Sequence, residues 1–403
     1  NGGLTMTGDT DVLNQQVDAA ALWPQSGIGL CLSGGGYRAM LFHLGALHRM
    51  NELGLLPLIS RYSSVSGGSI TSALLGLKWR RLIWQNSVAS NFEEEVVRPL
   101  RALAAANLFD HSTTLRSLES LATEVFSPGH IANEYNALLF QRATLQDLPG
   151  SEADDFTPRF VFNATNLMTG SLWRFSKPYM ADWKVGMWSN PTLSLAEAVA
   201  ASSAFPIALA PVQVPLDPVS MQPLAGASLA FPPYTERACL VDGGVYDNMG
   251  IETVWKESGV VLVSDASGRN APVPHPLLGG RDPLAVFGVF DSQVADLRKR
   301  DLIRSYTLPA SDQDYRGGAY WGVGSDITHY PAPSSLPCPP DRTRQLAAVA
   351  TVLSALQPAL QEQLINWGYA ICDAALNSFC STVPGGFGAR IVPATSFPYP
   401  GGV

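Results

Sequence analysis

The sequence is poor in charged residues and lacks a long hydrophobic run. Only 15% of its 403 residues are charged, the net charge is -8, and no block of five like charges occurs. An acidic chain without a basic block has no field that attracts nucleic acid, which excludes nucleic acid as a partner. The longest apolar stretch, residues 346–356, is shorter than the roughly 18 residues that a spanning helix needs. We expect no transmembrane segment, which favours a cytoplasmic or peripheral membrane location.

Metal-binding and disulfide patterns are also missing. The chain has five cysteines, widely separated and without a CxxC spacing. An odd, scattered set argues against both a disulfide framework and a zinc site, so the thiols are predicted to be free or structural. No spacing indicates a metal or an organic cofactor, and we expect none. The cysteines are Cys31, Cys239, Cys338, Cys372 and Cys380.

The chain starts with Asn-Gly-Gly in place of Met and shows no signal peptide, which predicts a trimmed or engineered end. Two strand–turn–helix units then follow. Each has an apolar run of strand length, a turn rich in Ser and Gly, and apolar residues at helical spacing. The first unit occupies residues 28–53 and the second residues 58–84.

Strands and helices continue to alternate, which predicts an α/β protein with a mainly parallel sheet covered by helices on both faces. Ligands of such sheets gather at the carboxyl ends of the strands. Further strands are expected at residues 158–165, 237–241 and 260–264, and helices at 93–106, 114–126, 194–206 (opened by a capping box of Ser194 and Glu197) and 342–379, interrupted near Pro358.

This pattern predicts a domain organisation with one catalytic unit and several additions. Residues 86–157 are interpreted as a helical cap inserted into that unit, and the Gly/Pro-rich tail is expected to be extended or loosely attached. The predicted parts are an N-terminal extension (1–26), a catalytic domain (27–340), C-terminal helices packed on it (341–380) and the tail (381–403).

Ser66 is the best candidate nucleophile. It stands in Ser64-Val65-Ser66-Gly67-Gly68, between the second strand and its helix. A serine on a tight strand-to-helix turn projects its hydroxyl above the sheet, beside a helix N-terminus. The usual pattern is Gly-x-Ser-x-Gly, so Ser64 replaces the first glycine here. Alone, the motif also fits an ordinary Ser/Gly-rich turn.

The loop Gly34-Gly35-Gly36 offers consecutive backbone amides at the start of the first helix, which suits an oxyanion hole. Residues 34–39 also fit the dinucleotide pattern GxGxxA, but that pattern requires an acid at the end of the next strand, and residues 58–65 contain none. A P-loop is excluded because no GK[ST] follows. A purely structural turn is the remaining alternative.

Asp242 is the candidate base, because it ends the strand at 237–241 and two glycines follow it. A free aspartate has a pKa of about 4 and is a weak base. A site with only Ser and Asp therefore requires burial of the carboxylate or a very close hydrogen bond to the serine. Asp247 and Asp265 are rival acids nearby, and a plain turn is the alternative.

Together, SGGGYRA, SVSGGS and VDGGVYDN in this order resemble the patatin-like phospholipases. Further likeness lies in Ala164-Thr165-Asn166-Leu167, in AASSAFP at 200–206, and in LINWGYA at 364–370, which looks like the bacterial branch, so the resemblance covers about residues 27–379. The resemblance implies a three-layer α/β/α fold and hydrolysis of lipid acyl esters by a Ser-Asp dyad without histidine. It assigns catalysis to Ser66 and Asp242 and the oxyanion hole to residues 34–36.

Arg38 matches the arginine of the Gly-Gly-Gly-x-Arg pattern shared with the cytosolic phospholipases. The resemblance implies a substrate-binding role for it, at the head-group phosphate. A solvated arginine at the start of a helix is the alternative.

Two other functions stay open. His329 follows both Ser66 and Asp242, as the α/β-hydrolase order Ser, Asp, His requires, so a triad esterase is the rival mechanism. A patatin-fold interaction protein without activity is the second alternative. The expected partner is a lipid or small ester; oligomeric state is not predicted. Trp-rich segments at 78–84 and 173–188 fit docking to a lipid surface, although core packing explains them better.

Overall fold

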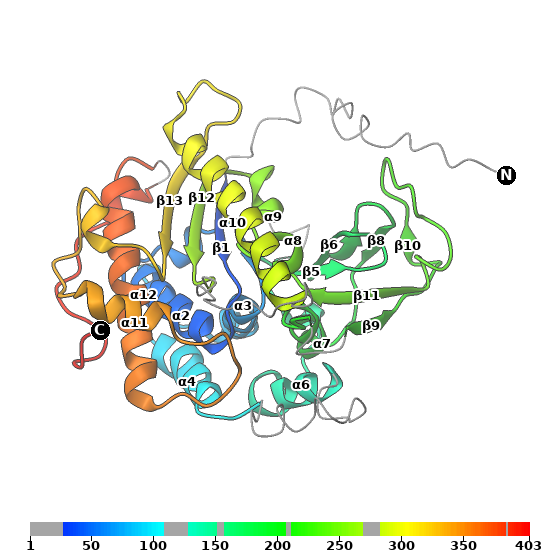
Figure 1. Ribbon diagram of the computed structural model, residues 1–403, viewed down its shortest axis with the longest axis horizontal. Helices are drawn as coiled ribbons and strands as arrows, with labels where there is room; N and C mark the ends of the chain where they lie inside the picture. Colours follow the sequence, from blue (N-terminus) through cyan, green and yellow to red (C-terminus); the bar gives the residue numbers. More distant parts are fainter. Residues whose placement is uncertain (1–26, 109–127, 151–156, 207–210, 269–282, 384–385) are drawn as a thin grey trace.

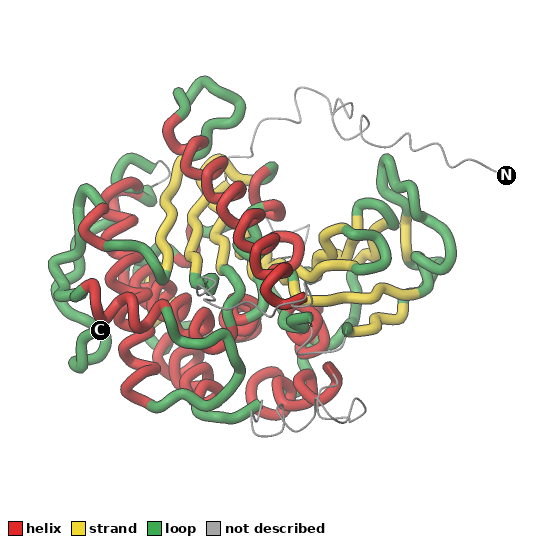
Figure 2. Tube along the Cα trace, viewed as in Figure 1, coloured by secondary structure: helices red, strands yellow, loops and turns green. Residues whose placement is uncertain are grey.

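The computed structural model describes residues 27–108, 128–150, 157–206, 211–268, 283–383 and 386–403 (Figure 1). Within these residues, 11 strands form one sheet, and helices cover both of its faces (Figure 2). The expected α/β architecture is confirmed. The predicted boundaries between catalytic domain, cap, C-terminal helices and tail stay a prediction.

The centre of the sheet is parallel and contains four of the five predicted strands; the fifth, expected at 237–241, pairs antiparallel outside it, and the strand at 317–322 was not predicted. The order of this parallel part is β5-β2-β1-β12-β13, and every neighbouring pair runs in the same direction. Parallel strands place their carboxyl ends at one edge of a sheet, where ligands collect. The bounds are β1 Gly27–Leu32, β2 Arg61–Ser64, β5 Arg159–Asn166, β12 Ser258–Asp265 and β13 Gly317–Gly322.

Antiparallel strands extend the sheet beyond β5. The path continues through β6, β7, β8 and β10, while β11 pairs with both β5 and β9. Short turns connect β5, β6, β7 and β8 as consecutive antiparallel hairpins, whereas β9, β10 and β11 join through longer connections. The bounds are β6 Ser171–Phe175, β7 Tyr179–Asp182, β8 Gly186–Ser189, β9 Val212–Pro215, β10 Met221–Gln222 and β11 Arg237–Asp242; a separate small hairpin joins β3 Trp84–Gln85 and β4 Val88–Ala89.

Alternation along the central strands creates two cores. Leu30 and Leu32 of β1 belong to a large core with the helices α2, α3 and α12, whereas Cys31 belongs to a smaller one with α9 and α10. Because successive strand side chains point to opposite faces, the two cores lie on opposite sides of the sheet. The three-layer arrangement follows.

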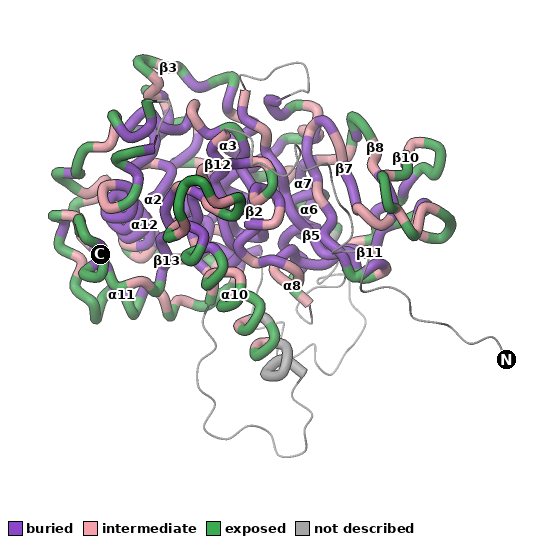
Figure 3. Tube along the Cα trace, turned by 90° about the horizontal axis from the view of Figure 1, so that it is seen from above, coloured by how far each residue is buried: buried purple, intermediate pink, exposed green. Residues whose placement is uncertain are grey.

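On the first face lie α2 Gly36–Glu52, α3 Gly67–Lys78, α4 Arg98–Ala104, α6 Pro128–Tyr135, α7 Leu195–Ser202, α11 Pro340–Ala347 and α12 Pro358–Phe379, and on the second α8 Gly244–Asp247, α9 Glu252–Trp255 and α10 Pro283–Thr307. Buried residues concentrate in α2, α12 and the central strands, whereas much of α10 is exposed (Figure 3).

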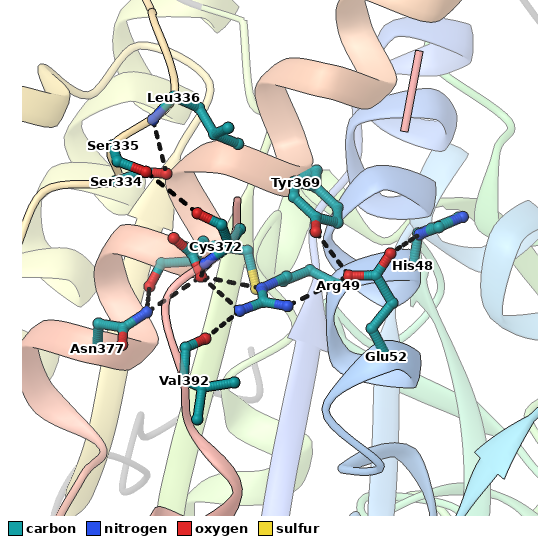
Figure 4. Close-up of polar contacts among 12 residues, drawn as sticks. His48, Arg49, Glu52, Ser334, Ser335, Leu336, Tyr369, Cys372, Asn377 and Val392 are labelled. Atoms are coloured by element: carbon teal, nitrogen blue, oxygen red, sulfur yellow. Dashed lines mark hydrogen bonds and ion pairs between the residues drawn. The ribbon is translucent and has the colours of Figure 1, made fainter. Parts of the chain in front are cut away.

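A buried polar cluster fastens α12 to α2. Arg49 of α2 bonds to the carboxylate of Asp373 at 2.8 Å and also to the carbonyl of Val392. Glu52 accepts a hydrogen bond of 2.6 Å from the Tyr369 hydroxyl, and Figure 4 shows Arg49 beside both Glu52 and Val392. The cluster joins two helices and the C-terminal segment.

Two predictions from the sequence are wrong, and a third concerns residues outside the described part of the chain. Ser194 makes no capping hydrogen bond, so the predicted capping box is wrong, although α7 does begin at the next residue. The tail is not loosely attached: Phe387 is fully buried and the Ala394 amide donates to Asp373. The helix expected at 114–126 lies outside the described residues.

The five cysteines are free thiols, as predicted. No helix among the described residues is both long enough and apolar enough to cross a membrane.

Candidate active site

Ser66 occupies the turn between β2 and α3 in a conformation that non-glycine residues rarely adopt. Its φ is 51° and its ψ is -120°, and it directly precedes the first residue of α3. Such a backbone costs about 1–3 kcal/mol and persists only where surrounding contacts hold it. Here the Ser66 amide donates to both the carbonyl (3.1 Å) and the hydroxyl (3.0 Å) of Ser202. Ser202, at the end of α7, therefore holds the turn in place.

The glycines after Ser66 allow the turn to touch the glycine loop. A Cβ on Gly67 would lie 2.2 Å from the Gly36 carbonyl oxygen, and one on Gly68 would lie 2.3 Å from the Leu32 oxygen. No real Cβ tolerates such distances, so both positions require glycine. Ser64, which replaces the usual first glycine, simply continues β2, and its hydroxyl lies 2.6 Å from that of Ser72.

The glycine loop leaves two amides available. The Gly34 amide donates to the Asn248 carbonyl at 3.1 Å, and the Tyr37 amide donates to the Val352 carbonyl at 3.0 Å. Between them, the amides of Gly35 and Gly36 meet no acceptor among the described residues. Of the three predicted oxyanion glycines, Gly34 thus already has an acceptor for its amide. A Cβ on Gly34 would lie 3.2 Å from Ser66 Cβ, so the absence of a side chain allows the loop to pass close to Ser66.

β5 brings Ser66 and Asp242 together. Ser64 at the end of β2 pairs with Phe162, and Asp242 at the end of β11 pairs with Ala164. β6 occupies the opposite edge of β5, so β2 and β11 share one edge and run toward each other. Their carboxyl ends are separated by two residues of β5, about 7 Å of strand.

The surroundings of both residues are dry. Ser66 is 8% exposed and Asp242 is 4% exposed. Asp242 Oδ1 accepts a hydrogen bond of 2.7 Å from the Gly244 amide, and the Gly243 amide donates to the same Ser202 carbonyl as Ser66 does. Within the described residues the Ser66 hydroxyl makes no hydrogen bond; catalytic hydrogen bonds are often long before substrate binds.

The rival acids have other partners. Asp247 is fully buried, accepts the amides of Met249 and Glu252, and lies 3.7 Å from Arg298. Desolvation raises the pKa of Asp247, and the Arg298 charge partly opposes this shift. Asp265 accepts the Tyr320 hydroxyl at 2.7 Å. Both carboxylates thus hydrogen-bond to groups on the second face of the sheet.

The histidines give the triad little support. His329 is exposed in a short 3-10 helix after β13, and both β1 and β12 lie between β13 and β2. Three strand spacings amount to roughly 14 Å of sheet. His43 is buried, and its ring nitrogens lie 2.8 Å from the Ser264 hydroxyl and 2.9 Å from the Ser33 carbonyl. In the described part of the chain, no histidine hydrogen-bonds to the Ser66 hydroxyl.

Arg38 lies beneath the glycine loop and is 3% exposed. The alternative of a solvated arginine is therefore wrong. Its guanidinium donates to the Ala266 carbonyl, the Val349 carbonyl and the Thr351 hydroxyl. The substrate-binding role stays a prediction.

The Trp-rich segments contribute mainly to the core. Trp79 packs against Tyr62 and Phe160, and Trp173 is fully buried. This agrees with core packing as the better explanation. Among the residues that the structure describes, no group of three His, Cys, Asp or Glu side chains is arranged to hold a metal ion.

Sequence reasoning missed two residues of the site. Ser202 links the Ser66 turn to the Asp242 turn, and the Asn248 carboxamide oxygen would lie 2.4 Å from a Cβ on Gly34. Both belong to the motifs AASSAFP and VDGGVYDN, so a signal was present, but their roles depend on contacts across the fold.

A family model described as Patatin-like phospholipase matches residues 30–255. Among solved structures, human GIVD cytosolic phospholipase A2 is similar with a TM-score of 0.53 at 13% identity, covering 86% of this chain and 58% of that chain. Its complex with methyl gamma-linolenyl fluorophosphonate and terbium chloride gives 0.50 at 15% identity, covering 90% and 59%. At these identities the likeness concerns the fold alone, and the chain spans less than two thirds of the human protein. A search of curated proteins finds no match.

Proposed function

The chain belongs to the patatin-like phospholipase family, and from this premise we propose that it is a serine acyl hydrolase that cleaves the carboxylic ester bonds of lipids. Ser66 is the nucleophile and Asp242 is its base.

One observation carries the proposal. The carboxyl ends of β2 and β11 face each other along one edge of β5. The turn that carries Ser66 therefore lies close to the end of the strand that carries Asp242. Both residues are more than nine-tenths buried. In such a site a carboxylate has little water to solvate it, which favours its action as a base.

In the acylation step, Asp242 takes the proton of the Ser66 hydroxyl as the oxygen attacks the ester carbonyl carbon. The carbonyl π pair moves onto oxygen, and the amides of Gly35 and Gly36 donate to this oxyanion. The intermediate collapses, the bond to the alcohol breaks, and the departing alkoxide takes the proton from Asp242. The product is an acyl-Ser66 enzyme and a free alcohol.

Deacylation repeats the steps with water. Asp242 removes a proton from water, the hydroxide adds to the acyl carbon, and Ser66 leaves and recovers the proton. A fatty acid is released. The positive end of α3, which begins at Gly67, favours the serine oxygen when it carries charge.

The test compares phospholipid, triglyceride and short acyl ester hydrolysis by the wild type and three variants. Ser66→Ala and Asp242→Asn should each lose on the order of 10⁴-fold in kcat, as expected when a member of a catalytic unit is removed. His329→Ala should keep wild-type activity because its exposed ring lies across the sheet from Ser66. Circular dichroism checks that each variant is folded.

Three outcomes would contradict the proposal. Full activity in Ser66→Ala would show that Ser66 is not the nucleophile. An inactive but folded His329→Ala would favour the triad mechanism. A wild-type chain that binds lipid but hydrolyses no ester would point to the interaction protein.

A further inference from the structure

The Arg38 side chain is enclosed by three loops of the site. Its Nη2 lies 3.0 Å from the position of a Cβ on Gly35 and 3.3 Å from one on Gly268. At 3% exposure it has almost no access to solvent. Burial lowers the pKa of Arg38 to about 10, partly opposed by the charge of Asp265, so the side chain is still a cation at neutral pH.

Four of the five N–H groups of the guanidinium are already in use. Nε and Nη2 both donate to the Ala266 carbonyl, at 3.2 and 2.9 Å, and Nη2 also donates to the Thr351 hydroxyl at 2.9 Å. Nη1 donates to the Val349 carbonyl. The acceptors belong to two loops: one follows β12 and the other precedes α12.

These two loops also hold the glycine loop itself. The Ala266 carbonyl oxygen lies 2.6 Å from the position of a Cβ on Gly35. The Val352 carbonyl accepts the Tyr37 amide at 3.0 Å and lies 2.5 Å from the position of a Cβ on Gly36. Arg38 therefore connects the two loops between which the amides of Gly35 and Gly36 lie.

We propose that Arg38 is a positioning residue of the oxyanion hole, which fixes the glycine loop between the loops at 266–268 and 349–352, and that it does not bind the substrate phosphate. This inference rests on the proposed function. Only one N–H of the guanidinium is free among the described residues, so a phosphate held by two N–H groups would require Arg38 to give up at least one of its present acceptors. Lysine keeps the charge but cannot reach three acceptors in fork geometry.

The chain offers a matched control. Arg316 is also 3% exposed, and its Nε and Nη2 share the Trp255 carbonyl at 3.1 and 3.0 Å. Its Nη1 donates to the carbonyls of Gln313 and Tyr315. It precedes β13, at the end of the sheet opposite the site. Arg316→Lys thus removes the same kind of fork without touching the glycine loop.

The experiment measures kcat and KM of wild type, Arg38→Lys and Arg316→Lys on phosphatidylcholine and on diacylglycerol with the same acyl chains. Arg38→Lys should lower kcat about 100-fold on both substrates, as loss of an oxyanion donor does, with the ratio between them unchanged. Arg316→Lys should keep kcat per folded molecule. If Arg38→Lys raises only the KM for phosphatidylcholine, Arg38 binds phosphate and the inference is overturned. Equal loss of kcat in both lysine variants overturns it too.

Hydrogen exchange supplies a readout that needs no turnover. Peptides covering 33–40, 264–268 and 348–353 should lose protection in Arg38→Lys and keep it in Arg316→Lys; unchanged protection in Arg38→Lys overturns the inference. The hydrogen-exchange measurement tests the role of Arg38 even if the chain hydrolyses no ester. Failure of the proposed function can therefore be distinguished from failure of this inference. Should Arg38→Lys not fold, Thr351→Val removes one acceptor and should give the same pattern with a several-fold loss of kcat.

Discussion

Ser66 combines a strained backbone with very close neighbours. Its φ is positive, at 51°, and its amide donates to the Ser202 hydroxyl. Strain at a non-glycine residue is maintained only where the surrounding structure over-determines it. Here the next residue, Gly67, packs its Cα against the glycine loop. The contact between Gly67 and Gly36 thus sets the proposed nucleophile relative to the proposed oxyanion amides.

Gly67→Ala should break this relation. The new Cβ would stand 2.2 Å from the Gly36 carbonyl oxygen, a backbone atom that cannot rotate away. We expect the loop to shift and kcat to fall by at least about 100-fold, comparable to the loss of one oxyanion donor. The measurement is ester hydrolysis per folded molecule. Gly401→Ala is the control, because nothing lies within 4 Å of its new Cβ; similar activity in both variants would contradict the geometry.

Residue-scale features were predictable where they are local. The turn at Ser66 and the Asp242-Gly243-Gly244 turn follow from small residues in a short segment. The commitment of the Gly34 amide to Asn248 was not predictable, because the two residues are more than 200 positions apart. Nothing in a run of three glycines says which amide has a partner.

At the level of elements, β11 decides how the site is assembled. Its apolar run predicted a strand but not a direction, since parallel and antiparallel strands can carry the same side chains when both faces are covered. The structure pairs it antiparallel to β5. That direction is what turns the end of β11, with Asp242, toward the end of β2.

The contact of α2 with α12 yields a stability prediction. Asp373 is fully buried and accepts from Arg49 and from the Ala394 amide. Asp373→Ala would remove the buried partner of Arg49 and leave it only the exposed carboxylate of Glu52, at 3.2 Å. Removing one partner of a buried ion pair typically costs about 3–5 kcal/mol of unfolding free energy. Urea denaturation measures this loss as a lower midpoint.

The neighbouring ion pair on α12 serves as the control. Glu362 lies 2.7 Å from Arg101, but the two side chains are 31% and 23% exposed. An ion pair so accessible to water contributes roughly 0–1 kcal/mol. Glu362→Ala should therefore shift the midpoint far less than Asp373→Ala does. Equal shifts would mean that burial adds nothing to the Arg49 pair.

On the scale of the whole molecule, the C-terminal tail shows what composition could not predict. The Gly/Pro-rich composition of 381–403 favoured a loose tail, yet Phe387 is fully buried and Asn366 of α12 accepts the Tyr399 amide at 3.1 Å. The local sequence has no regular periodicity, so its anchoring arises from α2 and α12 rather than from itself. A segment of this kind is ordered by the helices against which it packs, here α2 and α12.

Stability of the whole chain should depend on pH through His43. The ring lies between the Ser33 carbonyl and the Ser264 hydroxyl, and desolvation lowers its pKa from 6.5 to about 4; Asp265 opposes the shift and Arg38 adds to it. Between these values the unfolded chain binds a proton that the folded chain does not, so unfolding free energy falls as pH falls from about 6.5 to about 4. At 1.36 kcal/mol per pKa unit, the loss is about 3 kcal/mol.

His43→Gln should remove that part of the pH dependence, because glutamine does not titrate. Its absolute stability will differ, so the comparison is between slopes: urea unfolding at pH 7, 6, 5 and 4.5 for wild type, His43→Gln and His329→Gln. His329→Gln is the control because it makes the same exchange at an exposed position; a change of slope confined to His43→Gln would identify the buried ring as its source. An unchanged slope in His43→Gln would mean that the buried ring binds a proton as readily in the folded chain as in the unfolded chain, and would contradict the prediction.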